Sequence, residues 1–332
     1  MIIHLKEETS QEKTKEISQV IDAFIIKQSN YSVLVTSSAV KEIDSKYDEF
    51  ISEKFVFPND MQLSSAEYQK ETREIKIGDN FIGGNHNNTL VTIGPCGIES
   101  EEQIYKSAEL NKELGLSTLR AGSYKPRTSP YSFQGMGLAG LKILRKVCDE
   151  YNLSLVTEVR DSTHVNEVIE YADVVQIGAK SMYNHGILRA CSKIQKPVLL
   201  KRGFGTTLQE FVQASEFILS GGNYNVILCE RGIRTFETKT RFTLDLCGAS
   251  YLKEHTNLPI ILDPSHAIGY AYGVPDLARA CMAMGVEGIL IEVHPNPKVA
   301  KSDASQQLNH EQFKELFQSL KVISKAINRN II

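Results

Sequence analysis

The sequence of 332 residues lacks the features that mark several common classes of protein. Its six cysteines include no Cys-x-x-Cys pair, so we expect reduced thiols rather than a disulfide framework. No apolar run approaches the roughly 20 residues of a membrane helix, and the first residues, MIIHLKEETSQEKTKE, contain no signal-peptide core. The formal net charge of −3 excludes a global basic field that would attract nucleic acid or a membrane surface. These absences predict a cytoplasmic protein that binds neither nucleic acid nor a membrane.

The chain divides into regions of different texture. Residues 1–65 are charged and loosely patterned, and they predict a small α+β sandwich. Its expected elements are strands at residues 1–5, 31–37 and 55–63, and helices at residues 8–27 and 41–54. Residues 66–88 are polar and rich in glycine and asparagine, which predicts a linker with a short hairpin.

From residue 89 to residue 332 the pattern changes to apolar runs that alternate with stretches of helical spacing. The runs are TLVTIG, STLRAG, LSLVTEV, DVVQIGA, PVLLKRG, NVILCERG, PIILDPS and EGILIEVH. Runs that are apolar on both faces and rich in Val and Ile are typical of buried parallel strands. Eight of them over this length predict a (β/α)8 TIM barrel, and the missing G-x-G-x-x-G motif disfavours an open doubly wound sheet.

Polar residues stand at the carboxyl ends of these eight runs, where a barrel places its active site. They are Cys96, Arg120, Lys125, Glu158, Lys180, Lys201, Arg202, Glu230, Arg231, Asp263, His266, Glu292 and His294. Because parallel strands of a barrel end at one rim, we expect these side chains to share a site.

Four of the polar residues at or beyond the strand ends suit a divalent metal. Cys96 offers a thiolate, His266 an imidazole, and Glu292 and Asp303 offer carboxylates. This mixture suits Mn²⁺, Fe²⁺, Zn²⁺ or Co²⁺ better than Ca²⁺ or Mg²⁺. No short motif such as H-E-x-x-H strengthens the case, so a buried structural thiol and a hydrogen-bonded histidine remain the alternatives.

Cations gather at the same rim although the chain is acidic overall. The stretch LRAGSYKPRTSP carries Arg120, Lys125 and Arg127, followed by Thr128. Further cations at strand ends are Lys180, Lys201, Arg202 and Arg231. Grouped Lys and Arg side chains are typical of phosphate and carboxylate sites, so the sequence predicts phosphate-bearing small molecules bound beside a metal.

Seven stretches together resemble the 3-deoxy-D-arabino-heptulosonate 7-phosphate (DAHP) synthases, in particular the short type with an N-terminal ferredoxin-like domain. They are GPCGIES, RAGSYKPRTSPYSFQG, QIGAKSMYN, LLKRGFGTT, CERGIRTFE, LDPSHAIG and IEVHPNPKVAKSDASQQL. The resemblance covers residues 70–325 in order and is looser over residues 1–65. It implies the condensation of phosphoenolpyruvate with erythrose 4-phosphate, the first step of the shikimate pathway.

The resemblance also implies roles for single residues. Cys96, His266, Glu292 and Asp303 would hold the metal, and Arg127 with Thr128 would hold the phosphate of erythrose 4-phosphate. The phosphoenolpyruvate site would comprise Arg120, Lys125, Lys201 and Arg231. Lys125 is the expected proton donor at the aldehyde oxygen. Lys180 stands where the family has arginine, so the charge is kept and the bidentate fork is lost.

The resemblance further implies feedback inhibition by Tyr or Phe through the N-terminal region, and a homotetramer. A packing or oligomerisation module is the alternative for residues 1–65. The sister enzyme, 3-deoxy-D-manno-octulosonate 8-phosphate synthase, is the nearest alternative function, but KPRTS lacks the Ala-Asn that it carries between that Lys and Arg. A catalytically silent barrel that binds aromatic amino acids and regulates a partner is the alternative from another class.

Overall fold

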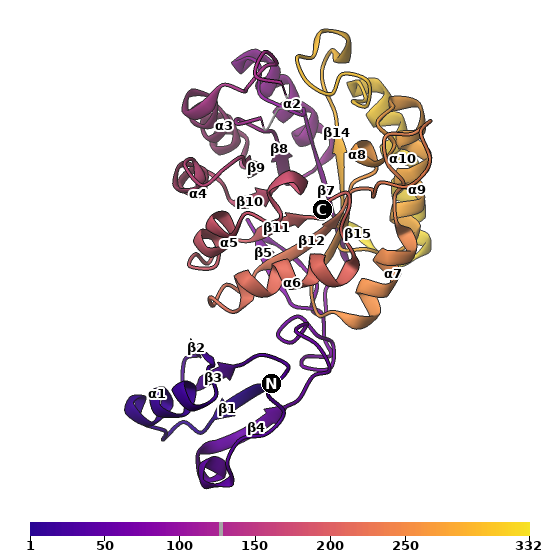
Figure 1. Ribbon diagram of the computed structural model, residues 1–332. Helices are drawn as coiled ribbons and strands as arrows, with labels where there is room; N and C mark the ends of the chain where they lie inside the picture. The colour runs from indigo at the N-terminus through magenta and orange to yellow at the C-terminus, as the bar shows by residue number, and fades with distance from the viewer. Residues whose placement is uncertain (126–128) are drawn as a thin grey trace.

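The computed structural model describes residues 1–125 and 129–332, and its main body is a barrel of eight parallel strands (Figure 1). Each strand pairs with the next in sequence, and β14 pairs with β7 to close the ring. The strands are β7 (Asn88–Gly94), β8 (Thr118–Arg120), β9 (Ser154–Val159), β10 (Val174–Ile177), β11 (Val198–Lys201), β12 (Val226–Glu230), β13 (Ile260–Leu262) and β14 (Gly288–Glu292). The prediction of a (β/α)8 barrel is confirmed, and each predicted run overlaps one strand.

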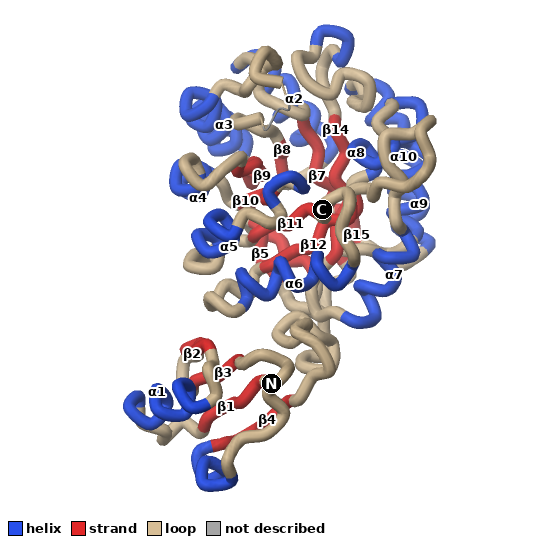
Figure 2. Tube along the Cα trace, in the orientation of Figure 1, coloured by secondary structure: helices blue, strands red, loops and turns tan. Residues whose placement is uncertain are grey.

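Helices surround the ring of strands (Figure 2). They are α2 (Glu101–Leu114), α3 (Gly137–Tyr151), α4 (Val165–Tyr171), α5 (His185–Cys191), α6 (Leu208–Leu219), α7 (Leu246–His255), α8 (Pro264–Ile268), α9 (Val274–Ala283) and α10 (His310–Ala326). Short 3-10 helices are η2 (Ala179–Ser181), η3 (Ala271–Gly273) and η4 (Pro297–Val299), and β15 (Asn330–Ile331) pairs with the start of β7. None of the helices in the described ranges has the length and apolarity needed to cross a bilayer.

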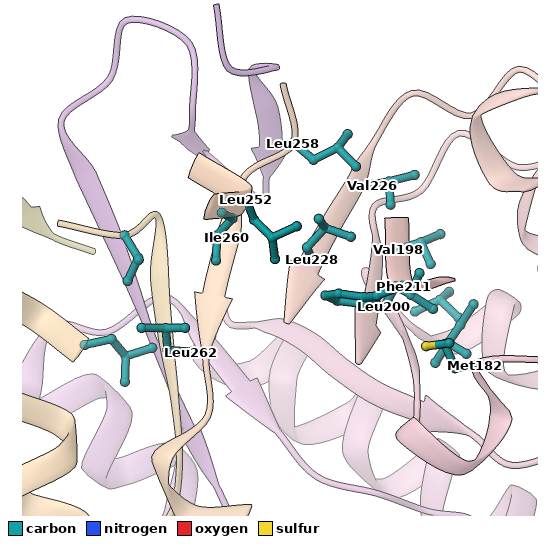
Figure 3. Packing of buried hydrophobic residues seen from close by; sticks show 14 of the residues in the cluster. Met182, Val198, Leu200, Phe211, Val226, Leu228, Leu252, Leu258, Ile260 and Leu262 are labelled. Atoms are coloured by element: carbon teal, nitrogen blue, oxygen red, sulfur yellow. The ribbon is translucent and has the colours of Figure 1, made fainter. Parts of the chain in front are cut away.

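The outer face of the strands packs on the helices through branched and aromatic side chains (Figure 3). Phe211 of α6 lies beside Leu200 of β11, and Leu252 of α7 lies between Leu228 and Ile260. All of these side chains are almost completely buried. This apolar layer fixes the directions of the strands and therefore the places where their carboxyl ends meet.

The opposite end of the barrel is closed by a hairpin formed by β5 (Ile75–Ile77) and β6 (Asn80–Ile82). Its three isoleucines pack with one side chain from most of the barrel strands, among them Leu90 and Val156. This hairpin fills the interior of the barrel at that end with apolar side chains, and the polar strand ends lie at the other rim.

The first 55 residues form a separate antiparallel sheet in the order β2-β3-β1-β4. Its elements are β1 (Ile2–Leu5), α1 (Gln11–Val20), β2 (Phe24–Lys27), β3 (Ser32–Val35), the 3-10 helix η1 (Ser45–Phe50) and β4 (Ile51–Phe55). A small α+β unit was expected here and is present, while its ferredoxin-like classification and the boundaries 1–65, 66–88 and 89–332 stay predictions.

Three of the elements expected in this unit were wrong. The predicted helix at residues 8–27 ends at Val20, because Asp22 adopts a left-handed conformation with φ of 49° and Phe24–Lys27 pairs with β3. The predicted helix at residues 41–54 shrinks to η1, since Ile51–Phe55 pairs with β1. The strand expected at residues 55–63 is for the most part irregular.

The segment between the N-terminal unit and the barrel is anchored by a partly buried carboxylate on α6. Oε1 of Glu216 accepts hydrogen bonds from the backbone of Gln62 (2.8 Å) and Ser64 (2.9 Å) and from the Ser64 hydroxyl (2.6 Å). Its Oε2 accepts from the backbone of Leu63 at 3.2 Å. A carboxylate with four donors anchors this segment against the helix that follows β11.

Candidate active site

The four residues chosen as metal ligands meet at the carboxyl end of the barrel. Sγ of Cys96 lies 3.3 Å from Oδ2 of Asp303, and Nε2 of His266 lies 3.4 Å from Oε1 of Glu292 and 4.0 Å from Oδ2 of Asp303. One donor atom each from Cys96, Glu292 and Asp303 lies within 4.8 Å of the others. His266 is not part of this three-residue group, but its Nε2 faces the two carboxylates of the group.

The stretch LDPSHAIG explains how His266 is oriented. Asp263 is the N-cap of α8 and its Oδ1 accepts from the backbone of His266 at 3.0 Å, while Pro264 begins the helix. The Nδ1 atom of His266 lies 2.8 Å from Oδ2 of Asp263. The Asp263 carboxylate lies close to Nδ1 but is not aligned for a hydrogen bond from it, while Nε2 faces Glu292 and Asp303.

Burial and charge set the protonation of these donors. Burial lowers the pKa of His266, which favours the neutral imidazole that a metal requires. Burial and the Glu292 carboxylate raise the pKa of the Cys96 thiol to about 12. Burial alone would raise the pKa of Asp303, but neighbouring positive charge, including that of Arg241 and Lys125, holds it well below its usual range. Binding a cation here would displace the thiol proton.

A cavity of about 510 Å³ opens beside the donor set and is strongly cationic. His266, Asp303 and Glu158 lie in its wall. The cations that line it are Lys125, Lys180, Lys201, Arg231, Arg234 and Arg241. Such an excess of positive charge in a concave site suits a ligand with phosphate and carboxylate groups.

The predicted cations differ in what they contact. Arg120 is 1% exposed and its Nη1 lies 2.7 Å from Oε1 of Glu292, so it lies behind the donor set and outside the described cavity wall. Nζ of Lys201 lies 2.5 Å from Oδ2 of Asp263. Lys125 donates from Nζ to the carbonyl of Cys96 at 2.9 Å. The contacts tie each of the three to the metal-ligand candidates or their supports.

Arg202 and Arg231 form an instructive pair, because both are 4% exposed. Nη1 of Arg202 lies 3.0 Å from Oε2 of Glu230 and 2.8 Å from Oδ2 of Asp245, so this guanidinium is neutralised within the fold. Arg231 lines the cavity, and its Nη1 has no hydrogen-bond partner among the described residues. A buried cation with an unused donor at a cavity wall is suited to bind an anion.

Lys180 lies on η2 and lines the cavity with an exposed side chain. Arg127 and Thr128 lie outside the described residues, so the expectation that they hold a phosphate is unaffected by the structure. Sequence reasoning missed Arg234, Arg241, Phe204 and Phe242, which also line the cavity. Arg234 lies within the stretch CERGIRTFE and could have been found there, whereas the loop around Arg241 carries no pattern that predicts a contact.

The aromatic pair among these residues supports the arginines. The rings of Phe204 and Phe242 stack with centroids 5.4 Å apart. The guanidinium of Arg231 lies 4.5 Å from the Phe242 ring centroid, and that of Arg234 lies 5.0 Å from the Phe204 ring centroid. Stacking on aromatic faces limits the movement of the two guanidinium groups before a ligand arrives.

Comparison with known proteins decides the family. A sequence model described as the DAHP synthetase I family matches residues 64–329. The chain belongs to this family. It is 45% identical over 266 residues to the phospho-2-dehydro-3-deoxyheptonate aldolase of Thermotoga maritima, covering 80% of this chain and 78% of that protein. The DAHP synthase resemblance is therefore confirmed, and the protein is an enzyme of the transferase type.

The chain is also similar to an enzyme with a different product and to two solved structures. The 2-dehydro-3-deoxyphosphooctonate aldolase of Francisella tularensis is 32% identical over 266 residues, which are 75% of this chain and 96% of that protein. The crystal structure of the Thermotoga maritima DAHP synthase superposes with a TM-score of 0.81 at 37% identity, covering 100% of this chain and 99% of that one. A truncated form of the Thermotoga maritima enzyme superposes with a TM-score of 0.76 at 41% identity, covering 81% and 98%.

Proposed function

We propose that this chain condenses phosphoenolpyruvate with erythrose 4-phosphate to give DAHP and inorganic phosphate. The observation that carries the proposal is the Arg231 guanidinium, whose Nη1 has no partner among the described residues, in a cationic cavity directly beside the Cys96, His266, Glu292 and Asp303 donors. The higher identity to the heptonate enzyme than to the octonate enzyme supports the shorter sugar, erythrose 4-phosphate, as the second substrate.

The donor set fits a divalent cation, which we propose to be Mn²⁺, Fe²⁺, Zn²⁺ or Co²⁺. Sulfur and imidazole are ligands that these ions accept and that Ca²⁺ and Mg²⁺ avoid. The ligands would be Cys96, His266, Glu292 and Asp303. When bound, such an ion would supply Lewis-acid polarisation of the aldehyde oxygen.

The cations of the cavity account for the remaining chemistry. Arg231, Lys201 and Lys180 would bind the phosphate and carboxylate of phosphoenolpyruvate and direct its C3 carbon at the aldehyde carbon of erythrose 4-phosphate. Formation of that C–C bond leaves a cation-like C2, which takes up water, and the phosphate then leaves with cleavage of its C–O bond. Phosphate and carboxylate clamps fix both partners and reduce the entropy cost of the encounter.

Lys125 is the proposed proton donor to the aldehyde oxygen. Burial alone would lower the pKa of Lys125, but Cys96, Glu158 and Glu292 raise it above its ordinary value. The ammonium group therefore holds its proton until negative charge develops on the oxygen. Its hydrogen bond to the carbonyl of Cys96 keeps it beside the donor set.

The test measures phosphate release by the purified chain with Mn²⁺ and phosphoenolpyruvate, in parallel with erythrose 4-phosphate and arabinose 5-phosphate. We expect turnover with erythrose 4-phosphate at least about 100-fold faster, a difference of about 2.7 kcal/mol in transition-state stabilisation. Preference for arabinose 5-phosphate would assign the octulosonate reaction. Absence of phosphate release with both sugars would favour the silent regulatory barrel.

We further propose that Tyr or Phe inhibits the enzyme through the N-terminal sheet, and that the enzyme is a homotetramer. The hydrogen bonds from residues 62–64 to Glu216 support a route from that sheet to α6 and β11. A chain lacking residues 1–60 keeps the anchoring segment and should retain turnover but lose inhibition. Equal inhibition of both forms by Tyr and Phe would contradict the proposal, and light scattering measures the assembly.

A further inference from the structure

Two adjacent glutamines, Gln306 and Gln307, contact the metal-ligand candidates from different sides. Gln306 donates from Nε2 to Oε2 of Glu292 at 2.5 Å, and its Oε1 accepts from Nη1 of Arg241 at 2.7 Å. Gln306 is 1% exposed. A single amide thus joins a carboxylate of the donor set to a cation of the substrate cavity.

The amide of Gln307 joins the two loops that carry Cys96 and Asp303. Its Oε1 accepts from the backbone of Cys96 at 2.9 Å, and its Nε2 donates to the carbonyl of Ser302 at 2.9 Å. Gln307 is also 1% exposed. Both hydrogen-bonding atoms of the side chain are used, so the distance between the two loops is fixed by one rigid planar group.

The loop around Asp303 needs such a support. Asp303 adopts φ of 47°, a conformation that costs a non-glycine residue about 1 kcal/mol or more. The Ser302 carbonyl held by Gln307 belongs to the peptide that immediately precedes Asp303. The backbone of Leu308 donates to the carbonyl of Glu292 at 3.0 Å, which ties the glutamine segment to the end of β14.

We propose that Gln306 and Gln307 are positioning residues that set the separation of the Cys96, Glu292 and Asp303 donors. The inference rests on the proposed metal site. Gln307 fixes Cys96 relative to Asp303, and Gln306 fixes the Glu292 carboxylate while it holds Arg241 at the substrate cavity. Partners of this kind orient metal ligands, and their loss weakens metal affinity by about 10–100-fold.

The experiment measures Mn²⁺ affinity by titration calorimetry on the full chain and on Gln306→Met and Gln307→Met. Methionine keeps the approximate volume and removes both hydrogen-bonding atoms. We expect about 10–100-fold weaker Mn²⁺ binding in each variant. Cd²⁺ provides a second readout, because its thiolate charge-transfer band reports the bond to sulfur, and this band should weaken more in Gln307→Met than in Gln306→Met.

Gln103→Met is the matched control. Gln103 is buried, accepts from the backbone of Glu99 and donates to the carbonyl of Gly97, so it bridges backbone within one loop and does not join two ligand loops. We expect comparable loss of stability in urea and less than about a threefold change in Mn²⁺ affinity, below the range for lost ligand supports. Equal weakening in all three variants would reduce the glutamines to general structural residues and overturn the proposal.

Near-isosteric variants decide the matter if a methionine variant does not fold. Gln307→Glu keeps the acceptor for Cys96 and loses the donor to Ser302, and Gln306→Glu keeps the acceptor for Arg241 and loses the donor to Glu292. Both should weaken Mn²⁺ binding. If the wild type binds Mn²⁺ and the folded variants bind it equally well, this proposal alone is overturned. If the wild type binds no Mn²⁺, the proposed function is overturned as well.

Discussion

Replacing Arg231 by methionine should abolish tight phosphoenolpyruvate binding without loss of fold stability. Burial lowers the pKa of the Arg231 guanidinium, and its Nη1 has no partner among the residues that the structure describes. Removing a cation from water carries a penalty of several kcal/mol that only good partners offset. The free energy of unfolding of Arg231→Met should therefore equal or exceed that of the wild type.

The loss of binding follows from the chemistry of the guanidinium. A phosphate engages an arginine with two charge-assisted hydrogen bonds, and each contributes about 1.5–3 kcal/mol. The sum is about 3–6 kcal/mol, and each 1.4 kcal/mol is a factor of ten. We expect the dissociation constant of phosphoenolpyruvate to rise by about 10²–10⁴-fold.

Arg202→Met is the matched control, since Arg202 is equally buried and has carboxylate partners on both Glu230 and Asp245. Its removal leaves an uncompensated buried charge and should lower the free energy of unfolding by about 3–5 kcal/mol. Urea unfolding measures stability, and calorimetry with Mn²⁺ present measures phosphoenolpyruvate binding. Normal binding of phosphoenolpyruvate by Arg231→Met would exclude Arg231 as the substrate contact. Unfolding as easily as Arg202→Met would show that Arg231 is neutralised within the fold.

Three further substitutions test separate parts of the account. Lys180→Arg places a bidentate donor at the cavity rim, and one added hydrogen bond contributes about 1 kcal/mol. The KM for phosphoenolpyruvate should therefore fall about three- to tenfold at similar kcat. An unchanged KM would speak against a phosphate contact. Glu216→Gln puts an amide against the backbone donors of residues 62–64 and should lower the free energy of unfolding by about 1–3 kcal/mol. Hydrogen exchange at residues 62–64 should become faster. Unchanged stability and exchange would show that Glu216 does not anchor this segment. Gly178→Ala would bring a Cβ to 2.1 Å from Oε1 of Glu158 and so displace this carboxylate. Turnover should fall at least about tenfold, because small displacements of groups in an active site slow catalysis by such factors. Full activity would show that Glu158 can move without cost.

The barrel follows from the sequence because its strands are buried on both faces. Runs such as VVQI (Val174–Ile177) and VLLK (Val198–Lys201) carry apolar residues on both faces and are completely buried, as expected of a parallel sheet covered by helices. Once the barrel is given, the carboxyl ends of its strands must meet, and this brings His266, which follows β13, close to Glu292, which ends β14. The meeting of the donors was thus predictable, while their role as ligands stays a prediction.

The N-terminal sheet was harder to predict because its periodicity misleads. Ile17, Val20, Ile21 and Phe24 keep helical spacing beyond the true helix end, and nothing local marks the turn at Asp22. Pairing with β3 then selects a strand for Phe24–Lys27. Long-range strand pairing overrides local spacing, and a single sequence does not display that pairing.

Within the site, residue type alone could not distinguish charged side chains that are paired within the fold from those available to bind a ligand. Arg202 and Arg231 both follow apolar strands, yet only the geometry shows that Glu230 and Asp245 neutralise Arg202. Gln306 and Gln307 lie within the stretch IEVHPNPKVAKSDASQQL, but the sequence does not reveal their bonds to the carboxylate of Glu292 and the backbone of Cys96. Such partnerships depend on loops meeting in three dimensions.

We propose that sulfur, imidazole and two carboxylates bind one divalent ion and that the condensation depends on this ion. The most direct measurement loads the wild type and Cys96→Ala with Mn²⁺, removes the excess, and determines bound metal and DAHP formation on the same samples. We predict near-stoichiometric metal and turnover in the wild type, and loss of both in Cys96→Ala with the fold intact by circular dichroism. Wild-type levels of metal and product in Cys96→Ala would contradict the account.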